Sequence, residues 1–119
     1  MKYLMLIYQG TTPLPGTDAW EALPEQEQKA IYADYGRLNK TEGVTPGLPL
    51  GLPENATTVR VQDGKTLTTD GPFVSVKEAL GGYFVLEADD LDGAIELASK
   101  IPAARHGGAI EIRPSETYW

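Results

Sequence analysis

Residues 69–83 read TDGPFVSVKEALGGY, and this stretch holds three features that ordinary loops seldom combine. They are a turn-forming Asp-Gly-Pro-Phe, an adjacent Lys-Glu pair and a Gly-Gly doublet. Asp, Gly and Pro favour turns because of their backbone preferences and local hydrogen bonds. The doublet leads into YFVLE at Tyr83–Glu87, whose apolar character is typical of an interior strand. The stretch therefore predicts a turn that is followed by an interior strand of a sheet.

The residues before this stretch predict one strand and one long helix. Tyr3–Tyr8 (YLMLIY) is an apolar run of strand length, and a Gly- and Pro-rich loop follows it. Asp18 can cap a short helical turn, and Pro24 suits the first position of the long helix. That helix carries its apolar residues at spacings of four and three, and it ends near Gly43; the apolar residues are Ile31, Tyr35 and Leu38.

The segment Thr45–Pro53 (TPGLPLGLP) contains three prolines and two glycines among three leucines. Such a composition cannot sustain a helix or an interior strand. We expect an ordered, extended loop that packs on apolar surface. Thr57–Gln62 then alternates valines with polar residues, and Asp63-Gly64 is a favoured two-residue turn before Lys65–Thr69, so these residues predict a β-hairpin.

The residues after Tyr83–Glu87 predict a second helix and a last strand. Asp89 can cap the helix, and Pro102 stops it. Its apolar stripe is Leu91, Ala94, Ile95, Ala98 and Ile101. Ala109–Arg113 then alternates two isoleucines with charged residues, as expected for a strand with one buried face.

The order of elements is strand, helix, hairpin, strand, helix, strand, and we assign residues 1–119 to one domain. It predicts an α+β fold with a split βαβ arrangement, in which both helices cover one face of a mostly antiparallel sheet. The other face has no cover within the chain. Because the strands are apolar on both faces, we expect a second copy to cover it in a homodimer.

Composition narrows the classes of function. Ten basic and seventeen acidic residues give a net charge of −7, which argues against nucleic-acid and membrane partners. The absence of cysteine excludes thiolate catalysis and zinc-thiolate or iron–sulfur sites. The opening MKYLMLIYQG lacks the length of a signal or membrane segment, so we expect a cytoplasmic protein.

The chain resembles the YCII-related family, whose DGPF signature corresponds to Asp70–Phe73. The similarity includes KYLMLIY, VRVQDGKTLTTDGPF, KEALGGYFVLEADDLDGAIELASKIPAARHG and the closing EIRP, in order and spacing. It implies a ferredoxin-like domain that dimerises into an α/β barrel. The wider superfamily includes cofactor-free monooxygenases, muconolactone isomerases and a YCII-like dehydrochlorinase, and most YCII-related proteins have no assigned activity.

Two features depart from the family pattern. The resemblance implies an active site in which a His on the first long helix is paired with an Asp, as proposed for some YCII proteins. The corresponding helix here, QEQKAIYADYGRLNK, has no His and offers Tyr32 or Tyr35 instead. Val74-Ser75-Val76 also replaces the usual small and acidic residues after DGPF, which predicts an altered pocket on an unaltered fold.

Asp70 and His106 are the candidate catalytic residues. Asp70 can polarise a substrate hydroxyl or orient a His, or it can fix its own turn by accepting from the backbone N–H groups that follow. His106 is the only imidazole and precedes Gly107-Gly108, so it can serve in acid–base chemistry or lie at the surface.

Three further residues are candidates for substrate binding. Lys77 can bind an anionic group, although a solvated surface position is common for Lys. Tyr8 and Tyr83 can line an aromatic cavity, and core packing explains them equally well. The acidic group Asp89-Asp90-Asp92 indicates a helix N-terminus, and no spacing indicates a metal site, so we expect neither metal nor other cofactor.

Two functions follow from these observations. The first is a homodimer that binds a small organic ligand in a pocket and runs cofactor-free acid–base chemistry of an isomerase, lyase or hydrolase type. The second is a non-catalytic ligand-binding or regulatory module, because DGPF-type proteins resemble partners encoded near extracytoplasmic-function sigma factors.

Overall fold

The computed structural model describes residues 1–72 and 80–118. In this part of the chain the α-helices are α1 (Asp18–Glu21), α2 (Glu25–Asn39) and α3 (Leu91–Ala98). The strands are β1 (Lys2–Tyr8), β2 (Val44–Pro46), β3 (Thr57–Gln62), β4 (Lys65–Asp70), β5 (Leu80–Glu87) and β6 (Ala109–Pro114). Two short 3₁₀ turns are η1 (Pro53–Asn55) and η2 (Pro102–Ala104).

Four strands form an antiparallel sheet in the order β2-β5-β1-β6. This order is that of a ferredoxin-like fold, so the predicted α+β class and split βαβ arrangement are confirmed. In the described residues the sheet has two free edges, β2 and β6, and it does not close into a barrel. The predicted hairpin is confirmed as a separate two-stranded sheet of β3 and β4.

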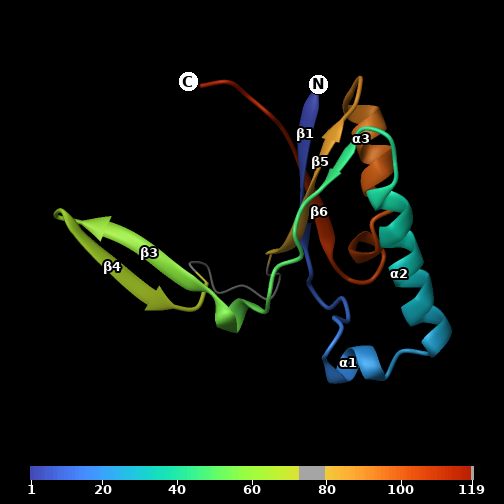
Figure 1. Ribbon diagram of the computed structural model, residues 1–119, viewed down its shortest axis with the longest axis horizontal. Coiled ribbons are helices and arrows are strands. Elements are labelled where there is room, and N and C mark those ends of the chain that lie inside the picture. The colour runs from blue at the N-terminus through green and yellow to red at the C-terminus, as the bar shows by residue number, and fades with distance from the viewer. Residues whose placement is uncertain (73–79, 119) are drawn as a thin grey trace.

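The long helices α2 and α3 lie on the same side of the four-stranded sheet, as predicted (Figure 1). The core is formed between this helix layer and one face of the sheet. Met5 of β1 is opposite Phe84 of β5 in the register, and both side chains are buried there. Leu38 of α2 and Ala98 of α3 join them from the helix layer.

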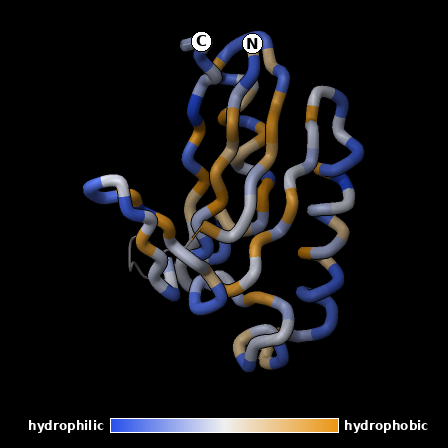
Figure 2. The backbone as a smooth tube through the Cα atoms, turned by 60° about the vertical axis from the view of Figure 1, so that its left-hand side comes forward, coloured by the Kyte–Doolittle hydropathy of each residue, from blue (hydrophilic) through white to orange (hydrophobic). Residues whose placement is uncertain are grey.

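On the opposite face of the sheet, the described residues form no layer that covers the apolar side chains. Leu4 and Leu6 point to this face and lie opposite Val85 and Tyr83 in the register. At the β6 edge this face becomes charged, because Glu111 of β6 lies opposite Leu6 in the register. Figure 2 turns this side forward and shows hydrophobic stretches along the long strands. We call this surface the open face.

The helix caps each lie one residue away from their predicted positions. Thr17, and not Asp18, caps α1, because its Oγ1 accepts from the Trp20 N–H at 3.3 Å. Asp90, and not Asp89, caps α3, because its carboxylate accepts from the Gly93 N–H at 2.9 Å. Both capping residues have extended backbone, which is the geometry that a cap requires.

The predicted stripe of α3 is wrong at two positions. Leu91 and Ile95 are 51% and 50% exposed, whereas Ala94, Ala98 and Ile101 are buried as predicted. The small alanines let α3 approach the sheet closely, which leaves the longer side chains at the flank of the contact. No sequence pattern indicated β2, which is a three-residue edge strand that starts the proline-rich segment. An edge strand tolerates Pro46 because one side of its backbone needs no partner.

Candidate functional site

An apolar pocket lies between α1, α2 and the ends of β1 and β5, beneath the loop 47–52. Its volume is about 540 Å³, within the range of small-molecule sites. Its walls come from four segments: the end of β1 with the following loop and α1 (Ile7, Gln9, Thr12–Pro15, Trp20), α2 (Ile31, Tyr32, Tyr35, Asn39), the loop Gly47–Leu52, and β5 (Gly81–Phe84). We call this cavity the aromatic pocket.

Two aromatic contacts shape the wall of the aromatic pocket. Trp20 meets Tyr32 edge to face, with ring centroids 5.3 Å apart and an interplanar angle of 70°. Tyr35 stacks on Phe84 with centroids 6.4 Å apart and an interplanar angle of 17°. Both arrangements are favourable for aromatic rings. The pocket therefore presents ring faces and edges that suit a flat organic molecule.

Local hydrogen bonds hold the two sides of the aromatic pocket in place. The side chain of Gln28 on α2 donates to the Trp20 carbonyl at 2.8 Å, which fixes α1 against α2. On the other side, Gly47 N–H donates to the Tyr83 carbonyl at 3.1 Å and Leu50 N–H donates to the Gly81 carbonyl at 3.0 Å. The loop 47–52 therefore stays attached to β5 beyond the end of β2. The loop runs along β5 as predicted, but the expected packing of its leucines on apolar surface is wrong, because Leu48, Leu50 and Leu52 are 72%, 45% and 38% exposed.

Gly47 is required at its position by close packing. A Cβ atom there would lie 2.4 Å from the Tyr83 carbonyl oxygen and 2.6 Å from the Tyr83 ring. Any other residue would push the loop away from β5, and the pocket would lose its cover.

Two residues that line the aromatic pocket have buried side-chain oxygens without hydrogen-bond partners among the described residues. These oxygens are Gln9 Oε1 and Thr12 Oγ1. Gly81 makes room for the Gln9 side chain, because a Cβ at this glycine would lie only 1.8 Å from the Gln9 amide nitrogen. A buried polar atom without a partner costs about 1–3 kcal/mol. A ligand that supplies the missing hydrogen bond would recover part of this cost.

Burial raises the pKa of the Tyr35 phenol, and the nearby Arg105 guanidinium partly opposes this shift. Tyr35 is therefore neutral at physiological pH, and its hydroxyl can donate a hydrogen bond. Among the described residues that line the aromatic pocket, the ionisable side chains are the three tyrosines at positions 32, 35 and 83.

The two predicted catalytic residues lie outside the described lining of the aromatic pocket. Asp70 is an exposed residue at the end of β4, opposite Thr57. His106 is partly buried after η2, where its N–H donates to the Ala103 carbonyl at 3.4 Å. No hydrogen bond or ion pair joins Asp70 to His106 within the described chain. Their joint catalytic role stays a prediction.

The carboxylate of Asp70 accepts no hydrogen bond from the described residues, and the N–H groups from Phe73 onward lie outside them, so its role in the turn stays a prediction. The base of the hairpin is closed by Gly71 instead. Its N–H donates to the Ala56 carbonyl at 2.6 Å, and its carbonyl accepts from the Thr58 hydroxyl at 2.7 Å. Pro72 follows and has no N–H to offer the carboxylate.

The predicted substrate-binding residues have three different positions. Tyr83 borders the aromatic pocket beside the loop 47–52, although its place opposite Leu6 in the register puts its side chain on the open face. Tyr8 lies on the open face, opposite Ala109 in the register and away from the described pocket lining. Lys77 falls outside the described residues. The roles of Tyr8 and Lys77 in binding therefore remain predictions.

The sequence profile of the YCII-related domain matches residues 1–116 of the chain. The chain belongs to the YCII-related family. An uncharacterized protein, R00369 of Rhizobium meliloti (strain 1021), is 27% identical over 128 residues, which cover 99% of this chain and 94% of that relative. The similarity thus extends over almost the full length of both proteins.

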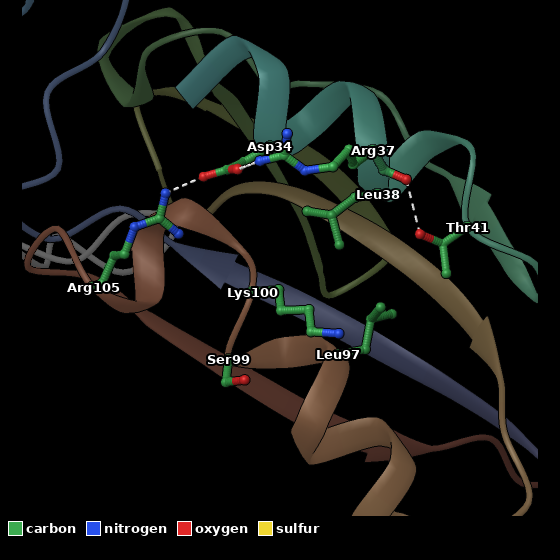
Figure 3. A pocket seen from close by; sticks show the side chains of 8 residues that line it. All are labelled: Asp34, Arg37, Leu38, Thr41, Leu97, Ser99, Lys100 and Arg105. Carbon is green, nitrogen blue, oxygen red and sulfur yellow. Dashed lines mark hydrogen bonds and ion pairs between the residues drawn. The ribbon is translucent and has the colours of Figure 1, made fainter. Parts of the chain in front are cut away.

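A second groove of this YCII-related chain lies between α2, the end of α3 and η2, with a volume of about 540 Å³. Figure 3 shows Asp34 of α2 between two guanidinium groups, and it forms ion pairs with both Arg37 and Arg105. Asp34 is mostly buried, whereas both arginines remain largely exposed. Because both carboxylate oxygens are engaged, we interpret the cluster as a tie between α2 and η2.

Two features are absent from the part of the chain that the structure describes. No group of three or more His, Cys, Asp or Glu side chains is arranged to hold a metal ion. None of the described helices combines the length and the apolar character needed to cross a bilayer. The aromatic pocket is thus the candidate site that the described part of this YCII-related chain supports best.

Sequence reasoning found Tyr83, Tyr32 and Tyr35 as candidates but did not bring them together in one cavity. It missed Gln9, Thr12 and Trp20. The signal for these residues was weak, because a loop of polar and proline residues usually lies at the surface. The contact of the loop after β1 with the proline-rich segment is long-range, and no local pattern encodes it.

Proposed function

We propose that this YCII-related protein is a cytoplasmic homodimer that binds a small, flat and largely apolar organic molecule in the aromatic pocket. The observation that carries the proposal is the combination of aromatic contacts in the wall with two unpaired polar atoms on residues that line the pocket. The walls favour an apolar or aromatic body, and Gln9 and Thr12 favour a hydroxyl or amide group on that body.

Binding is better supported than catalysis. The described lining carries neither a carboxylate nor an imidazole that could act as an acid or base at neutral pH. Cofactor-free acid–base chemistry by Asp70 and His106 therefore requires a substrate that reaches outside the aromatic pocket. A ligand-binding or regulatory module needs no substrate that reaches outside the aromatic pocket. One use of such a module is in sigma-factor regulation.

The binding proposal can be tested with a matched pair of probes, 4-propylphenol and propylbenzene. They share one apolar body, and only the phenol can donate to Gln9 Oε1. The indole N–H of Trp20 reports binding in ¹⁵N-labelled protein, and Trp119→Phe assigns its signal. We expect saturable shifts of the Trp20 signal, with the phenol binding at least fivefold more tightly.

Two isosteric variants locate the polar contact. Gln9→Met and Thr12→Val remove the unpaired oxygens without emptying the pocket. We expect them to abolish the preference for the phenol while the affinity for propylbenzene stays within twofold. Equal affinity of the wild type for both probes would reject the polar contact, and no saturable shift with either would reject the pocket as a ligand site.

Variants of the predicted catalytic residues separate binding from catalysis. Asp70 and His106 lie outside the described pocket lining, so Asp70→Asn and His106→Ala should leave the affinity for 4-propylphenol unchanged. A large loss of affinity in either variant would bring these residues into the ligand site and would revive the acid–base hypothesis.

The homodimer is supported by the open face. Its central residues are apolar, and charges of both signs border them at the β6 edge, where Glu111 and Arg113 lie opposite Leu6 and Leu4, whereas Thr45 of β2 is polar at the other edge. This arrangement of an apolar centre and a polar rim is typical of a protein interface. Sedimentation equilibrium should give twice the 12.9 kDa mass of one chain, and a monomer at all concentrations would reject the dimer.

A further inference from the structure

The hairpin of β3 and β4 stands away from the rest of the molecule (Figure 1). Its strands pair only with each other in the described chain. The radius of gyration is 16.2 Å, whereas a compact chain of this length has a value of about 13–14 Å. We call this hairpin the arm.

The arm has the correct turn but no core of its own. Asp63 and Gly64 have φ values of +50° and +75°, as in a type I′ turn that suits a two-residue hairpin. Val59 and Val61 share one face of the ribbon with the threonines opposite them, and they are 59% and 66% exposed. An isolated two-stranded ribbon is only marginally stable in water. This apolar face therefore needs a partner surface.

The direction of the arm indicates which surface that is. The helices lie on one side of the four-stranded sheet, and the arm projects from the other side, where the open face lies (Figures 1 and 2). Six-residue strands, such as those of the arm, are about 20 Å long, and stacked sheets lie about 10 Å apart. The arm is therefore long enough to pass beside a second sheet stacked on the open face.

Charge favours contact between the arm and another copy of this acidic chain. The arm contains two of the ten basic residues, Arg60 and Lys65, and two of the seventeen acidic ones, Asp63 and Asp70. It is therefore neutral, and the whole net charge of −7 lies on the remainder of the chain. An apolar and neutral surface can dock on an acidic body without like-charge repulsion.

We propose that the arm docks on a second copy of this chain, with Val59 and Val61 packed against the flank of the partner. In a two-fold dimer each copy gives one arm and receives one. The inference rests on the proposed homodimer, in which two open faces meet, and it adds a second contact outside those faces. The exposed valines of the ribbon then gain an apolar cover that the described residues of a single chain do not provide.

Variants of the two faces of the arm provide the first test. Val59→Thr with Val61→Thr keeps the β-branched shape and strand propensity but removes the apolar surface. Leu67→Thr is the matched control, because Leu67 lies opposite Arg60 on the other face of the ribbon and is 44% exposed. We expect the double variant to raise the dimer dissociation constant at least tenfold, and the control to change it less than threefold.

A cross-linking experiment tests the contact directly, and the absence of natural cysteine makes it specific. Val61→Cys is labelled with benzophenone maleimide and equilibrated with an excess of unlabelled, ¹⁵N-enriched wild-type chain. Irradiation should join the arm to ¹⁵N-containing peptides of the partner, as read by mass spectrometry.

The outcomes distinguish the two proposals. A dimer that is unaffected by the valine variants, and that yields only cross-links within the ¹⁴N chain, would overturn the docked arm and leave the homodimer intact. A wild-type protein that stays monomeric would overturn both.

Discussion

Gly10 allows the two loops beside the aromatic pocket to touch. It has a φ of +56°, and a Cβ atom there would lie 2.1 Å from the Gly107 carbonyl oxygen. Gly10→Ala combines a left-handed backbone penalty with a steric clash, so we expect it to lower the free energy of unfolding by about 2–4 kcal/mol. Urea denaturation measures this change.

Gly51 provides the control for that prediction. Its φ lies outside the left-handed region, and a Cβ atom there would have no neighbour within 4 Å, so Gly51→Ala should be neutral or slightly stabilising. Equal effects of the two substitutions would contradict the role of close packing at Gly10.

Tyr35 predicts a specific loss of stability at alkaline pH. Burial raises the pKa of its phenol in the folded state, so the folded protein holds this proton more tightly than the unfolded chain does. The stability that this tighter proton binding contributes is fully present below about pH 10, which is the ordinary pKa of tyrosine. It is lost as the pH rises from there through the raised pKa.

Tyr35→Phe has no proton to lose, so its free energy of unfolding should fall less steeply than that of the wild type above about pH 10. Urea denaturation between neutral and alkaline pH gives the difference between the two proteins. Parallel curves over this range would mean that the phenol ionises equally easily in both states.

At the scale of the elements, the ion pair between Asp34 and Arg105 ties α2 to the end of η2, where Arg105 is the C-cap. Asp34→Ala should lower the free energy of unfolding by about 1 kcal/mol, because the arginine partners are largely exposed and solvent screens the pairs. High salt should reduce the difference. Thermal denaturation at low and high ionic strength measures both effects.

The control for this prediction is Glu25→Ala, which removes an ion pair with Lys29 at 3.2 Å. Both members of that pair are at least three-quarters exposed, so we expect little change in stability. A loss as large as that of Asp34→Ala would show that the tie between α2 and η2 is no stronger than a surface pair.

The elements themselves were largely predictable from sequence, and their contacts with one another were not. The period of two in Val59 and Val61, together with Asp63-Gly64, was sufficient to locate the arm. Its separation from the main sheet has no local signal, because the same pattern suits a hairpin inside a sheet. Likewise, the residue spacing that predicted an apolar stripe on α3 did not indicate that Ile95 would lie at the edge of the contact between α3 and the sheet.

At the scale of the whole molecule, the open face predicts how the dimer can be broken. Leu6 lies in the centre of that face, between Tyr83 and Glu111 in the register. Leu6→Asp would bury a charge in the proposed interface, so we expect a monomer by sedimentation equilibrium. The expected far-UV circular dichroism is unchanged.

Ile95→Asp is the matched control, because Ile95 is an apolar residue that is 50% exposed on the helix layer. It should remain dimeric. If both variants dimerise like the wild type, the open face is not the interface.

The aromatic pocket takes most of its wall from loops and helix surfaces, whereas the central packing depends on residues such as Met5 and Ile101 that do not line it. Substitutions of the exposed leucines at positions 48, 50 and 52 of this loop can therefore alter the size and polarity of the cavity at little cost to folding, whereas Gly47 must be kept. Evolution can change ligand preference and scaffold separately in such an architecture. A genome that carries several paralogues of this domain can thus hold a set of proteins that share one skeleton and differ in what they recognise.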